Sequence, residues 1–285
     1  MPVAVTRASG RGVPEKAAGG ETSRRKDDPS TGAFSIATHR VLPREFFERD
    51  PIEVAPDLIG KLVVRGNRIG RIVEVEAYRG EDDPASHAYN GETPRNSAMF
   101  GPPGHLYVYF TYGMHYCANV VCRPAGVPGA VLVRALAPLG GIEEMRKVRP
   151  AALRDADLCS GPGKLCQALS IDRRLDGLDI VGTDSPLIVV DQPSPARGSV
   201  GTSPRIGLGA GRAARHRSGG RSGWALTQEQ ALTVPWRFFL VGDRNLSRRA
   251  PRAARMLEGA ENRVFVGAED AARKPRSGHP RIPPE

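Results

Sequence analysis

Side chains that could bind or activate an organic substrate concentrate in one short stretch of this 285-residue chain. All six tyrosines fall between Tyr78 and Tyr116, and three of the six histidines lie in the same stretch. The carboxylates of Glu74 and Glu76 come directly before it. A hydrophobic core would spread its aromatic residues over the whole domain, so this concentration indicates a polar, aromatic site.

Glu74, Glu76 and Tyr78 alternate along a predicted strand and therefore share one face of it. Two acids and a phenol make a poor core face, but they suit the wall of a polar, aromatic cleft. Flat rings beside a carboxylate could hold a nucleobase by stacking, which contributes about 1–3 kcal/mol per base. The alternative is a solvated strand face on which the glutamates pair with Arg71 or Arg134.

Tyr112 stands at the tip of a predicted hairpin, in the turn Tyr112-Gly113-Met114. A large aromatic side chain at a turn has little to pack against. It is either an ordinary, partly exposed tyrosine or a wedge that inserts between base pairs.

The net charge favours a polyanionic partner, most simply nucleic acid. The chain has 41 Lys and Arg against 31 Asp and Glu, giving +10 and a pI near 9.9. Residues 205–223 contain five arginines, six glycines and no acid. They form either a flexible basic loop that contacts phosphates or an insertion whose charge is incidental. For the chain as a whole, the alternative is a solubilising surface.

Several classes of protein are disfavoured. No run approaches eighteen apolar residues, and no apolar region stands out at the N-terminus. We therefore expect neither a membrane span nor a secretory signal, and we expect a cytoplasmic protein. Four cysteines are too few for a disulfide scaffold. Because no two of them are spaced as C-x-x-C, we also expect no metal site. Residues 160–164 end like a P-loop, but Leu158 and Leu165 stand where that loop needs Gly and Ser or Thr. The glycines of 207–211 follow no strand-to-helix transition, which disfavours a dinucleotide site.

Strand patterns outnumber helix patterns. We expect strands at 61–65 and 71–78, joined by the Gly-rich 66–70, at 106–111 and 115–122, joined by 112–114, and at 130–136 and 187–190. Helices are expected at 142–147 and 164–169. This order predicts a single α+β domain on a curved, mostly antiparallel sheet with flanking helices. The domain should span residues 39–250, between disordered tails at 1–38 and 251–285.

The motifs in this domain closely resemble those of the 3-methyladenine (alkyladenine, hypoxanthine-acting) DNA glycosylase family. In chain order they are 74–78 EVEAY, His87, 93–96 TPRN, 99–100 MF, 104–109 GHLYVY, 112–114 YGM, 132–136 LVRAL, 158–166 LCSGPGKLC, 204–208 PRIGL and 235–239 PWRFF. The resemblance covers about residues 40–245. It implies a single α+β domain with a protruding β-hairpin.

The resemblance also implies roles for individual residues. Glu76 matches the general base that activates a water molecule, and Arg134 helps to hold that water together with a main-chain carbonyl near Leu208. The remaining roles fall into three groups. Tyr78, His87 and Tyr109 match the rings around the extruded base, Asn119 the amide that rejects guanine, and Tyr112 the wedge. The resemblance thus implies a base pocket formed by Tyr78, His87, Tyr109, Asn119 and Leu208. We assign DNA contacts to Thr93, Arg95, Met114 and Lys164, and to Arg212, Arg215, Arg217 and Arg221 of the basic segment.

The implied activity is that of a DNA repair glycosylase. It would flip an alkylated or deaminated purine out of double-stranded DNA and hydrolyse its N-glycosidic bond, leaving an abasic site. No lysine lies in the matched catalytic strands, so we expect a monofunctional enzyme without lyase activity. We expect a monomer that needs no cofactor and works in the cytoplasm (at the nucleoid of a bacterium) or in a eukaryotic nucleus. The competing hypotheses are a nucleic-acid-binding module without catalysis and a small-molecule α+β hydrolase.

Overall fold

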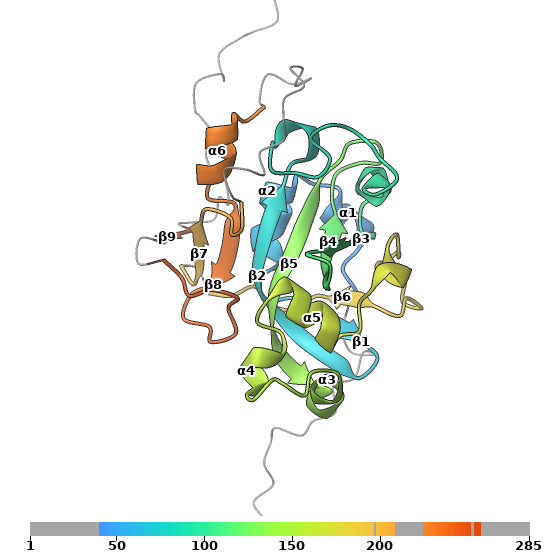
Figure 1. Cartoon of the computed structure of the whole chain (residues 1–285), viewed down its shortest axis with the longest axis vertical. Helices are drawn as coiled ribbons and strands as arrows, with labels where there is room; N and C mark the ends of the chain where they lie inside the picture. The colour runs from blue at the N-terminus through green and yellow to red at the C-terminus, as the bar shows by residue number, and fades with distance from the viewer. Residues whose placement is uncertain (1–39, 197, 209–224, 252–253, 258–285) are drawn as a thin grey trace, which may run out of the picture. The chain divides into compact units, whose positions relative to one another are not determined.

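Antiparallel strands form the centre of the structure, and short helices pack against them (Figure 1). The computed structural model describes residues 40–196, 198–208, 225–251 and 254–257. In these ranges the α+β fold class with a mostly antiparallel sheet is confirmed. The predicted tails lie outside the described residues, apart from residues 251 and 254–257. Residues 209–223 of the predicted basic loop also lie outside them.

Within the described ranges the sheet has nine strands, and every pairing between them is antiparallel. The strands are β1 (Leu62–Arg65), β2 (Arg68–Tyr78), β3 (Leu106–Thr111), β4 (His115–Val121), β5 (Ala130–Gly140), β6 (Ile188–Val190), β7 (Val200–Ser203), β8 (Arg237–Leu240) and β9 (Arg255–Met256). Their order is β3-β4-β5-β2-β8-β7-β9, and β1 pairs with both β2 and β6. Thus β2, which carries Glu74, Glu76 and Tyr78, lies between β5 and β8.

The predicted strands are present, with shifted ends. The β2 strand begins at Arg68, so the turn after β1 consists of Gly66 and Asn67 rather than of 66–70. Gly66 has a φ of +59°, a conformation that glycine adopts at little cost. The register between β2 and β5 shifts between Ile72 and Glu74 and again between Glu74 and Val75, so the regular pairing is interrupted beside the carboxylates.

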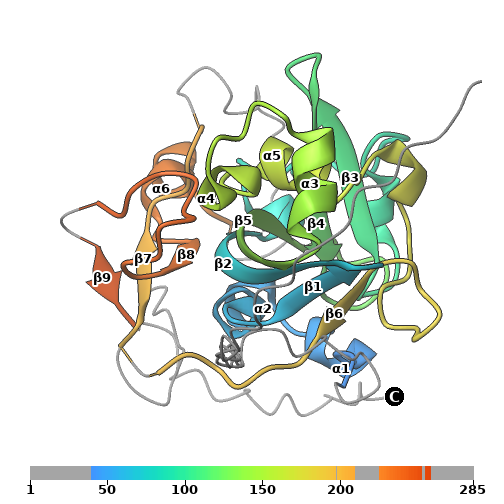
Figure 2. The same ribbon diagram turned by 90° about the horizontal axis from the view of Figure 1, so that it is seen from below.

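Helices cover both faces of the sheet. They are α1 (Arg44–Phe47), α2 (Pro51–Leu58), α3 (Ile142–Val148), α4 (Asp155–Leu158), α5 (Pro162–Ala168) and α6 (Gln228–Thr233), with short 3-10 turns at Gly80–Asp82, Ser97–Phe100 and Arg173–Leu175. The α2 helix lies on one face, whereas α3, α4 and α5 lie on the other (Figure 2). Asp50 begins α2 by accepting a hydrogen bond from the Ile52 amide, and Pro51 occupies the first turn.

The sequence patterns missed the part of the sheet formed by β7, β8 and β9. These strands are two to four residues long, too short to show a clear alternation. They are held by buried aromatic side chains, including those of Trp236, Phe238 and Phe239. The β9 strand extends the sheet beyond residue 250, because Leu257 donates a hydrogen bond to the Val200 carbonyl.

The hairpin of β3 and β4 projects from the neighbouring elements, as expected (Figure 2). Tyr112 and Gly113 form its tip with φ values of +52° and +68°. Tyr112 is 71% exposed and Met114 is 69% exposed. A bulky residue in a left-handed conformation is uncommon, so the turn presents two large apolar side chains to solvent at a conformational cost.

In the ranges that the structure describes, no helix is long and apolar enough to cross a membrane.

Candidate active site

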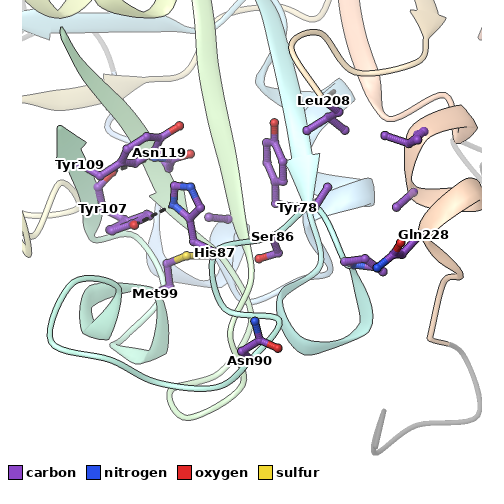
Figure 3. A pocket seen from close by; sticks show the side chains of 15 residues that line it. Tyr78, Ser86, His87, Asn90, Met99, Tyr107, Tyr109, Asn119, Leu208 and Gln228 are labelled. Carbon is purple, nitrogen blue, oxygen red and sulfur yellow. Dashed lines mark hydrogen bonds between the residues drawn. The ribbon is translucent and has the colours of Figure 1, made fainter. Parts of the chain in front are cut away.

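A cavity of about 260 Å³ opens beside the end of β2 (Figure 3). This volume is many times the roughly 30 Å³ that one water molecule occupies in the liquid. Figure 3 shows Tyr78 on one side of the cavity and the side chains of His87, Tyr109 and Asn119 on the other. The other lining residues are Pro84, Ala85, Ser86, Asn90, Met99, Tyr107, Ala130, Leu208, Gln228, Ala231 and Leu232. The five residues predicted to form the base pocket are therefore brought together.

Three aromatic side chains support one another along one wall. The rings of His87 and Tyr109 meet edge to face with centroids 4.5 Å apart, and those of Tyr107 and Tyr109 lie 5.4 Å apart. His87 Nδ1 lies 2.9 Å from the Tyr107 hydroxyl. Burial raises the pKa of Tyr107 to about 12, so this hydroxyl stays protonated at neutral pH. These contacts fix the positions of the rings relative to one another.

Glu76 is fully buried next to the Tyr78 hydroxyl and does not line the cavity. One carboxylate oxygen accepts a 2.7 Å hydrogen bond from the Ile206 amide. The other accepts from the Tyr78 hydroxyl at 2.9 Å and from Arg134 at 3.2 Å. Burial, and then the charge of Glu76, raise the pKa of Tyr78 well above its ordinary value. The phenol therefore remains a donor, and the carboxylate is fixed in orientation.

Glu74 contributes to an interior ion-pair network rather than to a cleft wall. Its carboxylate accepts hydrogen bonds from Arg134 Nε at 2.9 Å and Arg237 Nε at 2.8 Å. The Ser247 amide and hydroxyl add two more, at 2.6 and 2.7 Å. Although burial raises the pKa of Glu74, the charges of Arg134 and Arg237 lower it by more, so the net shift is downward.

The prediction of a carboxylate-lined cleft wall is therefore wrong for both glutamates, and so is the alternative of a solvated face. Both carboxylates are 0% exposed. Pairing with Arg134, which the alternative included, does occur, but in the interior. The physical reason is the β8 strand, which pairs with β2 and brings Arg237 next to the carboxylates. Charged groups enter an interior when partners of opposite charge accompany them.

Arg134 joins the two carboxylates from its position on β5. Burial lowers the pKa of Arg134, but Glu76 and Glu74 raise it by more, so the guanidinium remains charged. It also contacts the Ser247 hydroxyl at 3.2 Å. Asn119 lies on β4 opposite Leu132 of β5 and donates a 3.0 Å hydrogen bond to the Tyr107 carbonyl, with its side chain at the cavity.

The described residues assigned to DNA contacts, Thr93, Arg95, Met114 and Lys164, are not among the residues that line the cavity. Thr93 contacts Asn96 through its amide and hydroxyl. Arg95 donates to the Phe110 carbonyl at 3.3 Å, and Lys164 to the Ser160 hydroxyl at 3.2 Å. None of these contacts tests a role in DNA binding, so that role stays a prediction. The same holds for Tyr112 and Met114 at the hairpin tip. Four further residues, Arg212, Arg215, Arg217 and Arg221, lie outside the described residues.

The first arginine of the predicted basic loop is placed differently from the expectation. Arg205 is buried and forms an ion pair with Asp83, whose side chain is also fully buried. It therefore belongs to the interior of the domain.

Sequence reasoning also missed Tyr107 as the partner of His87 and Gln228 as a lining residue. A predicted helix at 228–233 could have revealed Gln228, since Thr227 and Gln230 form a capping box at its start.

Among the described residues, no group of three or more His, Cys, Asp or Glu side chains is arranged to hold a metal ion. All four cysteines are buried, and none of them forms a disulfide.

A carboxylate with a guanidinium partner, set behind an aromatic cavity, suits hydrolysis of a substrate that carries a flat ring. Comparison with known proteins identifies the class of hydrolase. The model of the methylpurine-DNA glycosylase (MPG) family matches residues 45–244. The chain belongs to this family.

Curated relatives are similar to this chain over most of their own length. A protein of Burkholderia lata is 47% identical over 208 residues, which are 73% of this chain and 91% of that protein. A protein of Methanocella arvoryzae is 45% identical over 74% of this chain and 98% of its own length. One from Streptomyces avermitilis is 43% identical over 72% of this chain and 90% of its own length. Each is named "putative 3-methyladenine DNA glycosylase".

The resemblance read from the sequence motifs is confirmed. The protein is a DNA glycosylase of the 3-methyladenine type, a hydrolase that acts on DNA in its repair.

Proposed function

We propose that the cavity binds a damaged purine flipped out of double-stranded DNA, and that Glu76 activates the water that hydrolyses its N-glycosidic bond. The substrates would be alkylated or deaminated purines of the 3-methyladenine, 7-methylguanine and hypoxanthine class. One observation carries this proposal. A buried carboxylate, held by three donors, accepts a hydrogen bond from the hydroxyl of Tyr78, whose ring lines an aromatic cavity.

The reaction follows from these positions. The bond between C1′ and the base nitrogen breaks through a state with positive charge on the sugar, which a nearby carboxylate stabilises. Water attacks C1′, its proton passes to Glu76, and the base leaves with the bonding electrons, so an abasic sugar remains. Of the three donors to Glu76, Arg134 is the most distant, at 3.2 Å. We propose that water takes this place on the carboxylate and that Arg134 then holds the water.

Binding of the base would use the walls of the cavity. A purine between Tyr78 and the pair of His87 and Tyr109 gains stacking on both sides, worth about 1–3 kcal/mol per base. Asn119 would clash with the exocyclic amino group of guanine and so exclude the normal base. Flipping costs least for a damaged or poorly paired base, which adds selectivity.

We further propose that the enzyme is monofunctional, monomeric and active on chromosomal DNA, in the cytoplasm if the cell is bacterial. No lysine is among the described residues that line the cavity, which supports hydrolysis by water rather than through a Schiff base.

The test is single-turnover excision by Glu76→Gln on duplexes that each carry one 7-methylguanine or hypoxanthine. We expect a loss of about 10²–10⁴-fold or more, because the general base is removed, with binding to lesion DNA retained. Glu143→Gln is the matched control, since Glu143 is an exposed glutamate on α3. Strand cleavage should appear only after alkali treatment, as expected for a plain abasic product. Near-normal excision by Glu76→Gln would refute the assigned role.

A further inference from the structure

Arg205 connects separate parts of the domain around the cavity. Its guanidinium donates to the Ala77 carbonyl on β2 at 2.9 Å and to the Ala231 carbonyl on α6 at 3.0 Å. It also donates to both oxygens of Asp83, one of them at 2.8 Å. Both side chains of this ion pair are fully buried. Burial lowers the pKa of Arg205, but the hydrogen bonds to Asp83 and the charges of Asp83, Tyr78 and Glu76 together raise it by more, so the guanidinium stays charged.

The same guanidinium packs against the aromatic ring that lines the cavity. Its central carbon lies 4.7 Å from the ring centroid of Tyr78 and 5.1 Å from that of Trp236. Arg205 does not line the cavity, whereas Tyr78 does. Arg205 therefore contacts the Tyr78 ring from within the protein, as a cation beside its π system.

Both partners also fix backbone that reaches the reaction site. Directly after Arg205, the Ile206 amide donates to Glu76 at 2.7 Å. Asp83 accepts from the backbone amides of Arg79 and Ala85, at 3.3 and 3.1 Å, within the loop that leads to His87. One ion pair thus holds the Tyr78 ring, an amide donor to the carboxylate, and the loop that carries the opposite wall.

We propose that Arg205 and Asp83 are a positioning pair for Tyr78 and Glu76, and that Arg205 sets how the cavity discriminates between neutral and positively charged purines. This inference rests on the proposed function. Arg205 touches neither base nor sugar; it acts through Tyr78 and Ile206.

Two physical effects make the excision of neutral bases depend more on Arg205 than the excision of cationic bases does. A guanidinium behind Tyr78 draws electron density away from the cavity side of the ring, which weakens its attraction for a cationic base. A neutral base is also the poorer leaving group, so its excision depends more on accurate placement of the water and of Glu76. Both effects predict that loss of Arg205 harms excision of hypoxanthine more than excision of cationic 7-methylguanine.

The test compares Arg205→Gln, Arg205→Lys and Asp83→Asn with the wild type in single-turnover excision of hypoxanthine and of 7-methylguanine. The lysine variant retains the buried charge beside Asp83 and so disturbs folding least, yet it lacks the planar fork that reaches three acceptor groups. The matched control is Arg49→Gln. Arg49 pairs with Asp57 at 2.8 Å and lies 4.8 Å from the Phe46 ring, away from the cavity.

We expect the rate constant for hypoxanthine to fall about 10²-fold in Arg205→Gln, and that for 7-methylguanine to fall less, because small displacements at a reacting centre have effects of this size. A purely structural defect would lower the amplitude of the excision reaction, which reports the fraction of folded enzyme. It would also change both rate constants by the same factor. Equal factors in all three variants, or unchanged rate constants, would overturn the inference. A wild type inactive on both lesions would instead refute the proposed function.

Discussion

Replacing Glu74 with glutamine should destabilise the fold strongly, although Glu74 does not line the cavity. The carboxylate accepts four hydrogen bonds, from Arg134, from Arg237 and twice from Ser247. A glutamine of the same shape presents an NH₂ group to some of these donors and leaves two guanidinium charges with less compensation. Breaking a buried pair by removing one partner costs about 3–5 kcal/mol.

This cost is large compared with the total stability of a domain, about 5–15 kcal/mol. Each kcal/mol shifts the melting temperature by about 2–4 °C in a domain of roughly 150–250 residues. We therefore expect Glu74→Gln to melt about 6–20 °C below the wild type. The difference should also depend on pH. Because the pKa of Glu74 is lowered from its ordinary 4.5, its stabilising contribution is complete above that value and is lost as the pH falls through the folded pKa.

The assay is thermal unfolding followed by circular dichroism at neutral pH and at several values below pH 4.5. Asp157→Asn is the control, because Asp157 pairs with Arg154 at the surface, where such pairs contribute little. The control should melt with the wild type at neutral pH. A drop of less than about 3 °C for Glu74→Gln, or a difference from wild type that stays constant into acid, would refute the account of a buried, charge-compensating glutamate.

Two further predictions concern DNA. Tyr112→Ser should slow excision on a fully paired duplex more than in a bubble, because a wedge offsets the unstacking left by the flipped base; its melting temperature should barely change, since the side chain is 71% exposed. Equal losses on both substrates would exclude a wedge. Neutralising Arg212, Arg215, Arg217 and Arg221 should weaken binding to all duplexes alike. The slope of log K against log salt should flatten by about 0.9 for each arginine that binds a phosphate in the wild type. An unchanged slope would show that those arginines bind no phosphate.

The sequence predicted the parts of the fold that depend on local pattern. The hairpins of β1 with β2 and of β3 with β4 follow from alternating side chains around Gly66 and Gly113. The resemblance to the family placed Tyr78 and His87 in one pocket, and the cavity contains both. These residues lie close together along the chain, so local motifs were sufficient to group them.

The rest depended on contacts between distant segments. Arg237 meets Glu74 across 163 positions, and Arg205 meets Asp83 across 122. No periodicity marks such partners, because each charge stands in a stretch that locally resembles a surface strand or a basic loop. These charges are buried because β8 pairs with β2 and because Arg205 reaches the Ala231 carbonyl on α6. The physical rule that buried charges are paired becomes useful only when that packing is known.

Among the described residues, the interior behind the cavity holds six buried ionisable side chains whose charges cancel. They are the carboxylates of Glu74, Glu76 and Asp83 and the guanidiniums of Arg134, Arg205 and Arg237. If Glu76 takes the proton of the attacking water, as we propose, this cluster holds one uncompensated positive charge in surroundings where water screens weakly. Removing any one guanidinium would change that balance, even from a residue that never touches the substrate.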